Sequence, residues 1–137
     1  MRPMLRAARS VLLVTALVLS AILSMLPVLG ASPRQDATVR GEVVDVFCYR
    51  SDPGHRGDVH VDCALSCARK GAVLGILTGT GEVYVITGEF TTEANRRLLP
   101  FVGRTVVATG EAGEANGTRT IRVTSIAPAE QADQSST

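Results

Sequence analysis

The stretch TVRGEVVDVFCY, residues 38–49, decides the fold that this 137-residue sequence predicts. Its side chains alternate, so that Val39, Val43 and Phe47 fall on one side of an extended chain and Val44 falls on the other. Valine and phenylalanine at this density and with a period of two favour a β-strand over a helix. Cys48 then stands at the far end of a first strand, next to the loop SDPGHRG, whose proline and glycines predict irregular structure.

Four more strand-like runs follow and form two hairpins. These runs cover residues 72–78, 82–87, 104–111 and 118–126. Residues 89–99, between the hairpins, have the composition of a helix. Five strands with a helix between the third and the fourth is the order of elements in an OB-fold, a small Greek-key barrel. We therefore predict an all-β domain with short helices, a five-stranded OB-like barrel over residues 38–127. An open antiparallel sheet covered by the same helices is the alternative.

Residues 58–70, DVHVDCALSCARK, predict a short helix inserted after the first strand. Asp58 is suited to the N-cap position, and Gly71 is placed to end the helix in a left-handed conformation. Successive residues of a helix are rotated by about 100°, so His60, Cys63 and Cys67 fall on one narrow face. The pattern predicts that one imidazole and two thiols point in the same direction.

These three side chains and Cys48, at the end of the first strand, form a candidate metal site of three sulfurs and one nitrogen. All three cysteines of the protein belong to it. Thiolate and imidazole ligands suit zinc, cuprous copper or an iron centre, whereas calcium and magnesium prefer oxygen ligands. We therefore predict a zinc, copper or iron ion bound by Cys48, His60, Cys63 and Cys67.

A structural disulfide is the alternative use of these cysteines. An exported chain meets an oxidising environment, where Cys48 bonded to Cys63 or Cys67 would fasten the helix to the barrel. Closing a loop of about 15 to 19 residues stabilises a fold by roughly 3 kcal/mol, but one thiol is then left over. A third interpretation pairs Cys67 with His60 as nucleophile and base, although no third orienting residue is evident. His55, in the glycine-containing loop, and Asp45 are expected to be solvated.

Residues 1–30 have the layout of a signal peptide or of an N-terminal membrane anchor. Three arginines precede an uncharged apolar run over residues 11–30, which fits an export signal and is also long enough to span a bilayer. Both interpretations place the rest of the chain outside the cytoplasm, in a periplasmic or extracellular location. Contact with a membrane is expected only through an uncleaved N-terminal segment. Residues 31–37 then predict a flexible leader, and residues 128–137 predict a disordered tail.

Charge and composition argue against nucleic acid as a partner. The formal net charge is +1, and loss of the three arginines in residues 1–30 changes it to −2. The chain has two tyrosines, three phenylalanines and no tryptophan. Binding of nucleic acid calls for a basic patch and stacking aromatic side chains. A protein partner stays open on these grounds.

Four short motifs within residues 38–126 resemble those of known proteins. They are Gly41-x-Val43-Val44-Asp45, Cys48-Tyr49, His60-x-x-Cys63-Ala64-x-x-Cys67 and Gly81-x-Val83-Tyr84. In these motifs the chain resembles a group of small exported bacterial proteins of unassigned function that look like OB-type barrels. The resemblance implies a metal or redox site made by Cys48, His60, Cys63 and Cys67, and it implies no known reaction.

The sequence thus predicts an exported, non-enzymatic domain that binds copper, zinc or iron through three cysteines and one histidine. Such a domain would serve as an accessory of a membrane redox or metal-handling system. The alternative, from a different class, is a disulfide-stapled OB-like interaction module without metal, which recognises a protein or glycan on its barrel face.

Overall fold

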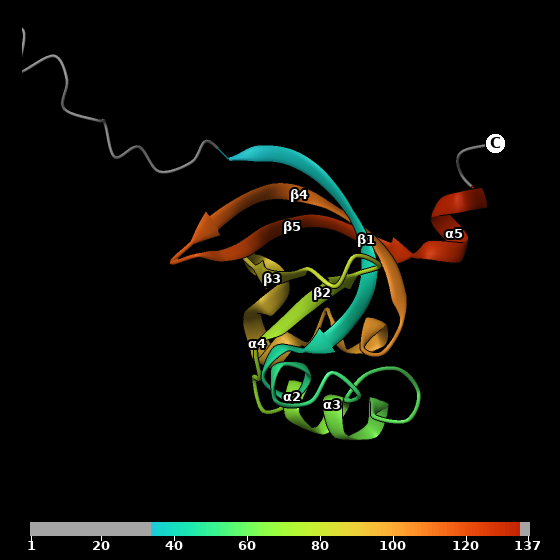
Figure 1. Ribbon diagram of the computed structural model, residues 1–137. Helices are drawn as coiled ribbons and strands as arrows, with labels where there is room; N and C mark the ends of the chain where they lie inside the picture. The colour runs from blue at the N-terminus through green and yellow to red at the C-terminus, as the bar shows by residue number, and fades with distance from the viewer. Residues whose placement is uncertain (1–33, 135–137) are drawn as a thin grey trace, which may run out of the picture. The chain divides into compact units, whose positions relative to one another are not determined.

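Five strands close into a barrel in the computed structural model, which describes residues 34–134. The strands are β1 (Gln35–Asp45), β2 (Leu74–Thr78), β3 (Val83–Thr87), β4 (Thr105–Ala115) and β5 (Thr118–Pro128). Around the barrel they follow the order β1-β2-β3-β5-β4, and pairing of β4 with β1 completes the circle. The predicted fold, a small five-stranded OB-like barrel with short helices, is confirmed (Figure 1).

Short helices lie in the connections between the strands, and one follows the last strand. They are α2 (Val46–Ser51), α3 (Val61–Ala68), the 3-10 turns η1 (Glu89–Thr91) and η2 (Leu99–Phe101), α4 (Thr92–Asn95) and α5 (Ala129–Gln134). Helices α2 and α3 lie together at the end of the barrel where β1 ends (Figure 1). The predicted helix after the first strand is therefore present, as two helices that carry Cys48 and Cys67.

Strand β1 pairs with two neighbouring strands, because it is long and its pairing partner on one edge begins where the other ends. Residues 35–42 pair antiparallel with β4, and residues 41–45 pair with β2. Gly41 stands where the two pairings overlap, and a Cβ atom there would lie 2.2 Å from the carbonyl oxygen of Leu77. Backbones that approach this closely require glycine. The last residues of β1 are thereby brought beside α2 and α3.

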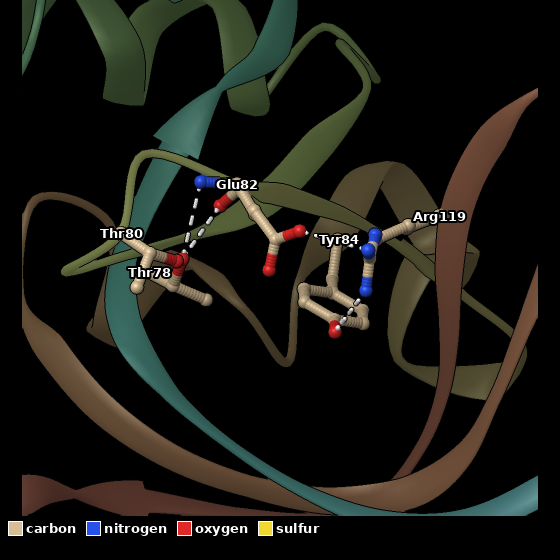
Figure 2. A network of polar contacts seen from close by, with 5 residues as sticks. All are labelled: Thr78, Thr80, Glu82, Tyr84 and Arg119. Carbon is tan, nitrogen blue, oxygen red and sulfur yellow. Dashed lines mark hydrogen bonds and ion pairs between the residues drawn. The ribbon is translucent and has the colours of Figure 1, made fainter.

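A short parallel pairing of β3 with β5 closes the barrel on its other side. A polar network joins β5 to the β2–β3 hairpin (Figure 2). The Arg119 guanidinium lies 2.8 Å from a Glu82 carboxylate oxygen and donates a 3.1 Å hydrogen bond to the Tyr84 hydroxyl. In the hairpin turn, the Thr78 hydroxyl accepts a hydrogen bond from the Glu82 amide and lies 2.8 Å from the Thr80 hydroxyl. Because an exposed ion pair contributes less than about 1 kcal/mol, this network aligns the hairpin more than it stabilises the fold.

Inward-facing side chains of the strands form the core together with side chains from the connections, such as Leu98. The largest fully buried side chains are Val43, Leu74, Ile76, Leu98, Val106 and Ile121. The prediction that the first strand runs on to Cys48 is wrong, because β1 ends at Asp45 and Phe47 is 79% exposed. The Asp45 carboxylate accepts hydrogen bonds from the amides of Phe47 and Cys48. Such a cap starts a helix and prevents the strand from continuing.

The connection from β3 to β4 contains the short elements η1, α4 and η2, so the helix predicted over residues 89–99 forms only in short, interrupted pieces. The hydroxyls of Thr91 and Thr92 donate hydrogen bonds to the carbonyls three residues earlier, which competes with helical hydrogen bonding. Three successive residues, Glu93, Ala94 and Asn95, then have φ angles of 52°, 53° and 59°. These left-handed residues reverse the chain and bury the Asn95 side chain.

The β4–β5 hairpin is longer than predicted, because strand residues replace most of the expected turn GEAGEANG. Only Asn116 and Gly117 separate the two strands, and their φ angles are 51° and 72°. Two positive φ angles suit the tight turn that joins right-twisted strands. The register shifts between Thr109 and Gly110, where a Cβ atom on the glycine would lie 2.1 Å from a carbonyl oxygen of β5.

Regular structure also extends further at both ends of the domain than predicted. Strand β1 begins at Gln35 and pairs with β4 from there. The prediction of a flexible leader over residues 31–37 is therefore wrong for residues 35–37. At the other end, α5 occupies much of the predicted disordered tail over residues 128–137. A bidentate ion pair of 2.9 and 3.2 Å between Arg40 and Asp133 joins α5 to β1.

The predicted signal peptide or membrane anchor over residues 1–30 lies outside the described residues. Within residues 34–134, none of the helices has both the length and the apolar character needed to cross a membrane.

Candidate metal centre

Side chains from β1, α2 and α3 meet at one end of the barrel and form a candidate metal centre. One carboxylate oxygen of Asp45 and the sulfurs of Cys48 and Cys67 all lie within 4.8 Å of one another. Among residues 34–134, this is the one such group of three acidic, cysteine or histidine side chains. The structure thus brings together two of the four predicted ligands, Cys48 and Cys67, and adds Asp45.

Asp45 is held firmly by the backbone of α2. The residue is only 3% exposed, and its Oδ1 atom accepts hydrogen bonds of 2.9 and 3.1 Å from the amides of Phe47 and Cys48. A carboxylate has about four lone-pair sites, so two such bonds leave others for a cation. The expectation that Asp45 is solvated is wrong, because the chain turns from β1 into α2 at this residue and buries its side chain.

Two sets of hydrogen bonds fix Cys67 at the end of α3. The chain reverses at Gly71, whose φ is 86°, and the amides of Gly71 and Ala72 donate to the carbonyls of Ala68 and Cys67. This Schellman motif confirms Gly71 as the residue that ends the helix. The second set comes from α4, where Asn95 Nδ2 donates hydrogen bonds of 3.0 and 2.9 Å to the carbonyls of Ala68 and Ala72.

Helix α3 turns its alanines toward the barrel and Cys63 toward solvent. Ala64 and Ala68 are buried, and such small side chains allow the helix to lie close to the strands. Cys63 is exposed and lies one turn before the half-buried Cys67 on the same helix. Cys63 therefore lies beside the group of three and outside it.

His60 precedes α3 and does not follow its register. It is the N-cap residue, with φ −123° and ψ 0°, and α3 begins at the next residue instead of at Asp58. Its ring stacks on that of His55, with centroids 4.4 Å apart and planes within 8° of parallel. The predicted common helical face therefore holds Cys63 and Cys67 but does not extend to His60.

The two imidazoles line a small cavity that Glu42 and Asp45 also line. Its volume is about 10 Å³, which is close to the space that one water molecule requires. His55 Nδ1 and His60 Nε2 are buried and have no hydrogen-bond partner among residues 34–134. The expectation that His55 is merely solvated is therefore wrong for one side of its ring, since that side packs against His60.

The surroundings of the two inner thiols oppose their ionisation. Burial, followed by the negative charges of Asp45, Cys67 and Cys63, raises the pKa of Cys48 from 9.0 to about 11. The pKa of Cys67 is also raised, first by burial and then by the charges of Asp45 and Cys63. A raised pKa makes a poor nucleophile at neutral pH, which argues against Cys67 as a catalytic thiolate. A bound cation reverses the effect, because the same negative groups attract it while it displaces the thiol protons.

The donor set fits a metal ion that accepts both sulfur and oxygen. Tetrahedral zinc with sulfur ligands at about 2.3 Å places neighbouring sulfurs about 3.8 Å apart. The ligand atoms of Asp45, Cys48 and Cys67 lie within 4.8 Å of one another. Side-chain movements of about 1 Å, which rotamer adjustment allows, therefore bring them to the distances of a zinc site. All three cysteines are free thiols, so the predicted disulfide of Cys48 with Cys63 or Cys67 is not formed in this structure.

Two residues that build the centre were not predicted as such from the sequence. Asp45 carries a usable signal, since an aspartate at the end of an apolar strand and three residues before a cysteine is suited to cap a helix. Asn95 carries none, because its hydrogen bonds reach 23 and 27 residues back along the chain. Its role follows from the tertiary fold.

Comparisons with known proteins give no match for this chain to any family model, curated protein or solved structure. The resemblance to small exported bacterial proteins therefore stays a prediction, and the centre itself carries the evidence about function.

Proposed function

We propose that the protein is an exported small domain that binds one zinc, copper or iron ion through Asp45, Cys48 and Cys67. The observation that supports this proposal is the convergence of one buried carboxylate and two thiols from three different elements, within 4.8 Å. Zinc accepts carboxylate and thiolate ligands together, whereas cuprous copper and iron–sulfur centres take the thiolates. The mixed donor set favours zinc among the three.

The proposed role is non-enzymatic, as an accessory of a membrane redox or metal-handling system. The raised pKa of Cys48 and of Cys67 suits thiols that ionise when a cation arrives better than it suits nucleophiles. Export is inferred from the arginines and apolar run of residues 1–30. An exported domain is placed to take up an ion outside the cytoplasm and deliver it to a membrane partner.

Elemental analysis of the protein purified without chelators, combined with thiol counting, tests the proposal. We expect one equivalent of metal in the native chain. The variants Asp45→Asn, Cys48→Ser and Cys67→Ser should each lose most of it, whereas Ser66→Ala on the exposed side of α3 should retain it. A metal-free protein with one disulfide and one free thiol would contradict the proposal and support the stapled interaction module.

A further inference from the structure

We infer that Cys63 is the exchange ligand of this centre, which holds an ion together with Cys67 before the ion passes to Cys48 and Asp45. The inference rests on the proposed binding of metal by the inner group. It assigns to Cys63 a role in the movement of the ion, distinct from that of a resident ligand.

Exposure decreases step by step along the four side chains. Cys63 is exposed, Cys67 and Cys48 are half-buried, and Asp45 is almost completely buried. Cys67 is the link between the outer and the inner part, since Cys63 precedes it by four residues on α3 and its own sulfur belongs to the group within 4.8 Å. An ion in solvent therefore meets a cysteine pair first and the carboxylate last.

The outer pair has the spacing of a two-ligand site. Cys63 and Cys67 are four residues apart on α3, and side chains at this spacing are neighbours on a helix surface, about 5–6 Å apart at Cβ. Two thiolates so placed reach a common soft ion. Because the Schellman turn and Asn95 hold the end of α3, Cys67 presents the same sulfur to both sites.

The transfer between the sites is an exchange of ligands without oxidation. The incoming ion forms bonds to the sulfurs of Cys63 and Cys67, and both thiols release their protons to the solvent. Bonds from the ion to Cys48 and Asp45 then form as Cys48 releases its proton, and the bond to Cys63 breaks as that sulfur takes up a proton. The ion stays bound to Cys67 throughout, and release follows the same steps in reverse.

Stopped-flow measurement of metal transfer tests the inference on the full chain. Protein loaded with one equivalent of Zn²⁺, and in a parallel series with Cu⁺, is mixed with an excess of a chromogenic chelator, and uptake is followed in the reverse direction. Equilibrium competition with the same chelator gives the affinity. The variants are Cys63→Ser, Cys63→His, Cys48→Ser and, as the matched exposed control on the same helix, Ser66→Ala.

We expect Cys63→Ser to slow uptake and release by similar factors, each about tenfold or more. Both rates then fall, while their ratio, which sets the affinity, changes less. Cys63→His restores an exposed metal ligand and should recover much of the exchange rate, whereas a purely structural role of Cys63 would not be rescued by imidazole. Cys48→Ser should instead lower the affinity.

Two results would overturn the inference alone. One is a native chain that binds one equivalent of metal, together with a Cys63→Ser variant that exchanges the metal as fast as Ser66→Ala does. The other is a loss of affinity in Cys63→Ser as large as in Cys48→Ser, which would make Cys63 a resident ligand. A native chain that takes up neither of these ions, and no iron either, would refute the proposed function, and the inference with it.

Discussion

Replacement of Asn95 by alanine should destabilise the fold by about 2–4 kcal/mol. The side chain is 3% exposed, and its amide donates to two carbonyls at the end of α3. Loss of buried hydrogen bonds that leaves acceptors unpaired costs about 1–3 kcal/mol. Alanine in the left-handed conformation, at the observed φ of 59°, costs roughly a further 1 kcal/mol relative to asparagine. The sum is large compared with the usual effect of a surface substitution.

Two further substitutions at this position separate the contributions. Asn95→Gly removes the amide but relieves the backbone, so it should cost about 1–3 kcal/mol. Asn95→Asp places a carboxylate oxygen against carbonyl oxygens and should be at least as destabilising as alanine. The matched control is Asn116→Ala, which has a similar φ of 51° in an exposed turn and should cost only about 1 kcal/mol.

Urea unfolding followed by circular dichroism measures these differences as changes in the free energy of unfolding. Equal slopes in denaturant are required for the comparison, since a changed slope indicates a changed denatured or native state. If Asn95→Ala and Asn95→Gly both lie within about 0.5 kcal/mol of the native protein, then Asn95 does not hold the end of α3 as described.

Three other predictions concern the thiol and the barrel. With metal removed, Cys48 should react with iodoacetamide at pH 8 about 100-fold more slowly than in the urea-unfolded chain, because its pKa of about 11 lowers the thiolate fraction. Mass spectrometry measures both rates of alkylation, and equal rates would contradict this prediction. The same raised pKa predicts a stability contribution that is fully present below pH 9 and lost as pH rises to about 11, because the native thiol keeps its proton longer than the unfolded one. The free energy of unfolding of Cys48→Ser should therefore decline less over this range than that of the native protein. An identical decline would refute the prediction. Gly41→Ala should destabilise the fold by about 1–3 kcal/mol or more, since its Cβ would meet the Leu77 carbonyl. The control Gly79→Ala, with no atom within 4 Å of its Cβ, should change the melting temperature little. Similar melting temperatures for the two variants would argue against the close approach of β1 and β2.

The barrel is predictable from the sequence because its strands obey local rules. Alternation of valines in residues 38–46 and the glycines between the following runs are sufficient to indicate strands and hairpins. Gly71 is likewise a local signal that correctly ends α3. These features depend on neighbours within a few residues, which is the range over which sequence patterns are informative.

The centre is less predictable because its geometry depends on where helices begin. One aspartate side chain ends β1 at Asp45 and moves Cys48 from a strand onto a helix. A later start of α3 leaves His60 outside the helical register and free to stack on His55. Asn95 acts across more than twenty residues of chain, so no local pattern could have revealed its role.

X-ray absorption spectroscopy at the edge of the bound metal identifies the ligands of the centre directly. For the zinc-loaded protein, we expect two sulfur ligands at about 2.3 Å and the remaining ligands as light atoms at about 2.0–2.2 Å, one of them from Asp45. Asp45→Asn binds the ion more weakly, so it is measured with an excess of zinc, where it should show an altered light-atom shell with the two sulfurs in place. A shell of three sulfurs and one nitrogen, as the sequence alone predicts for Cys48, His60, Cys63 and Cys67, or a shell without sulfur, would show that Asp45, Cys48 and Cys67 are not the ligands.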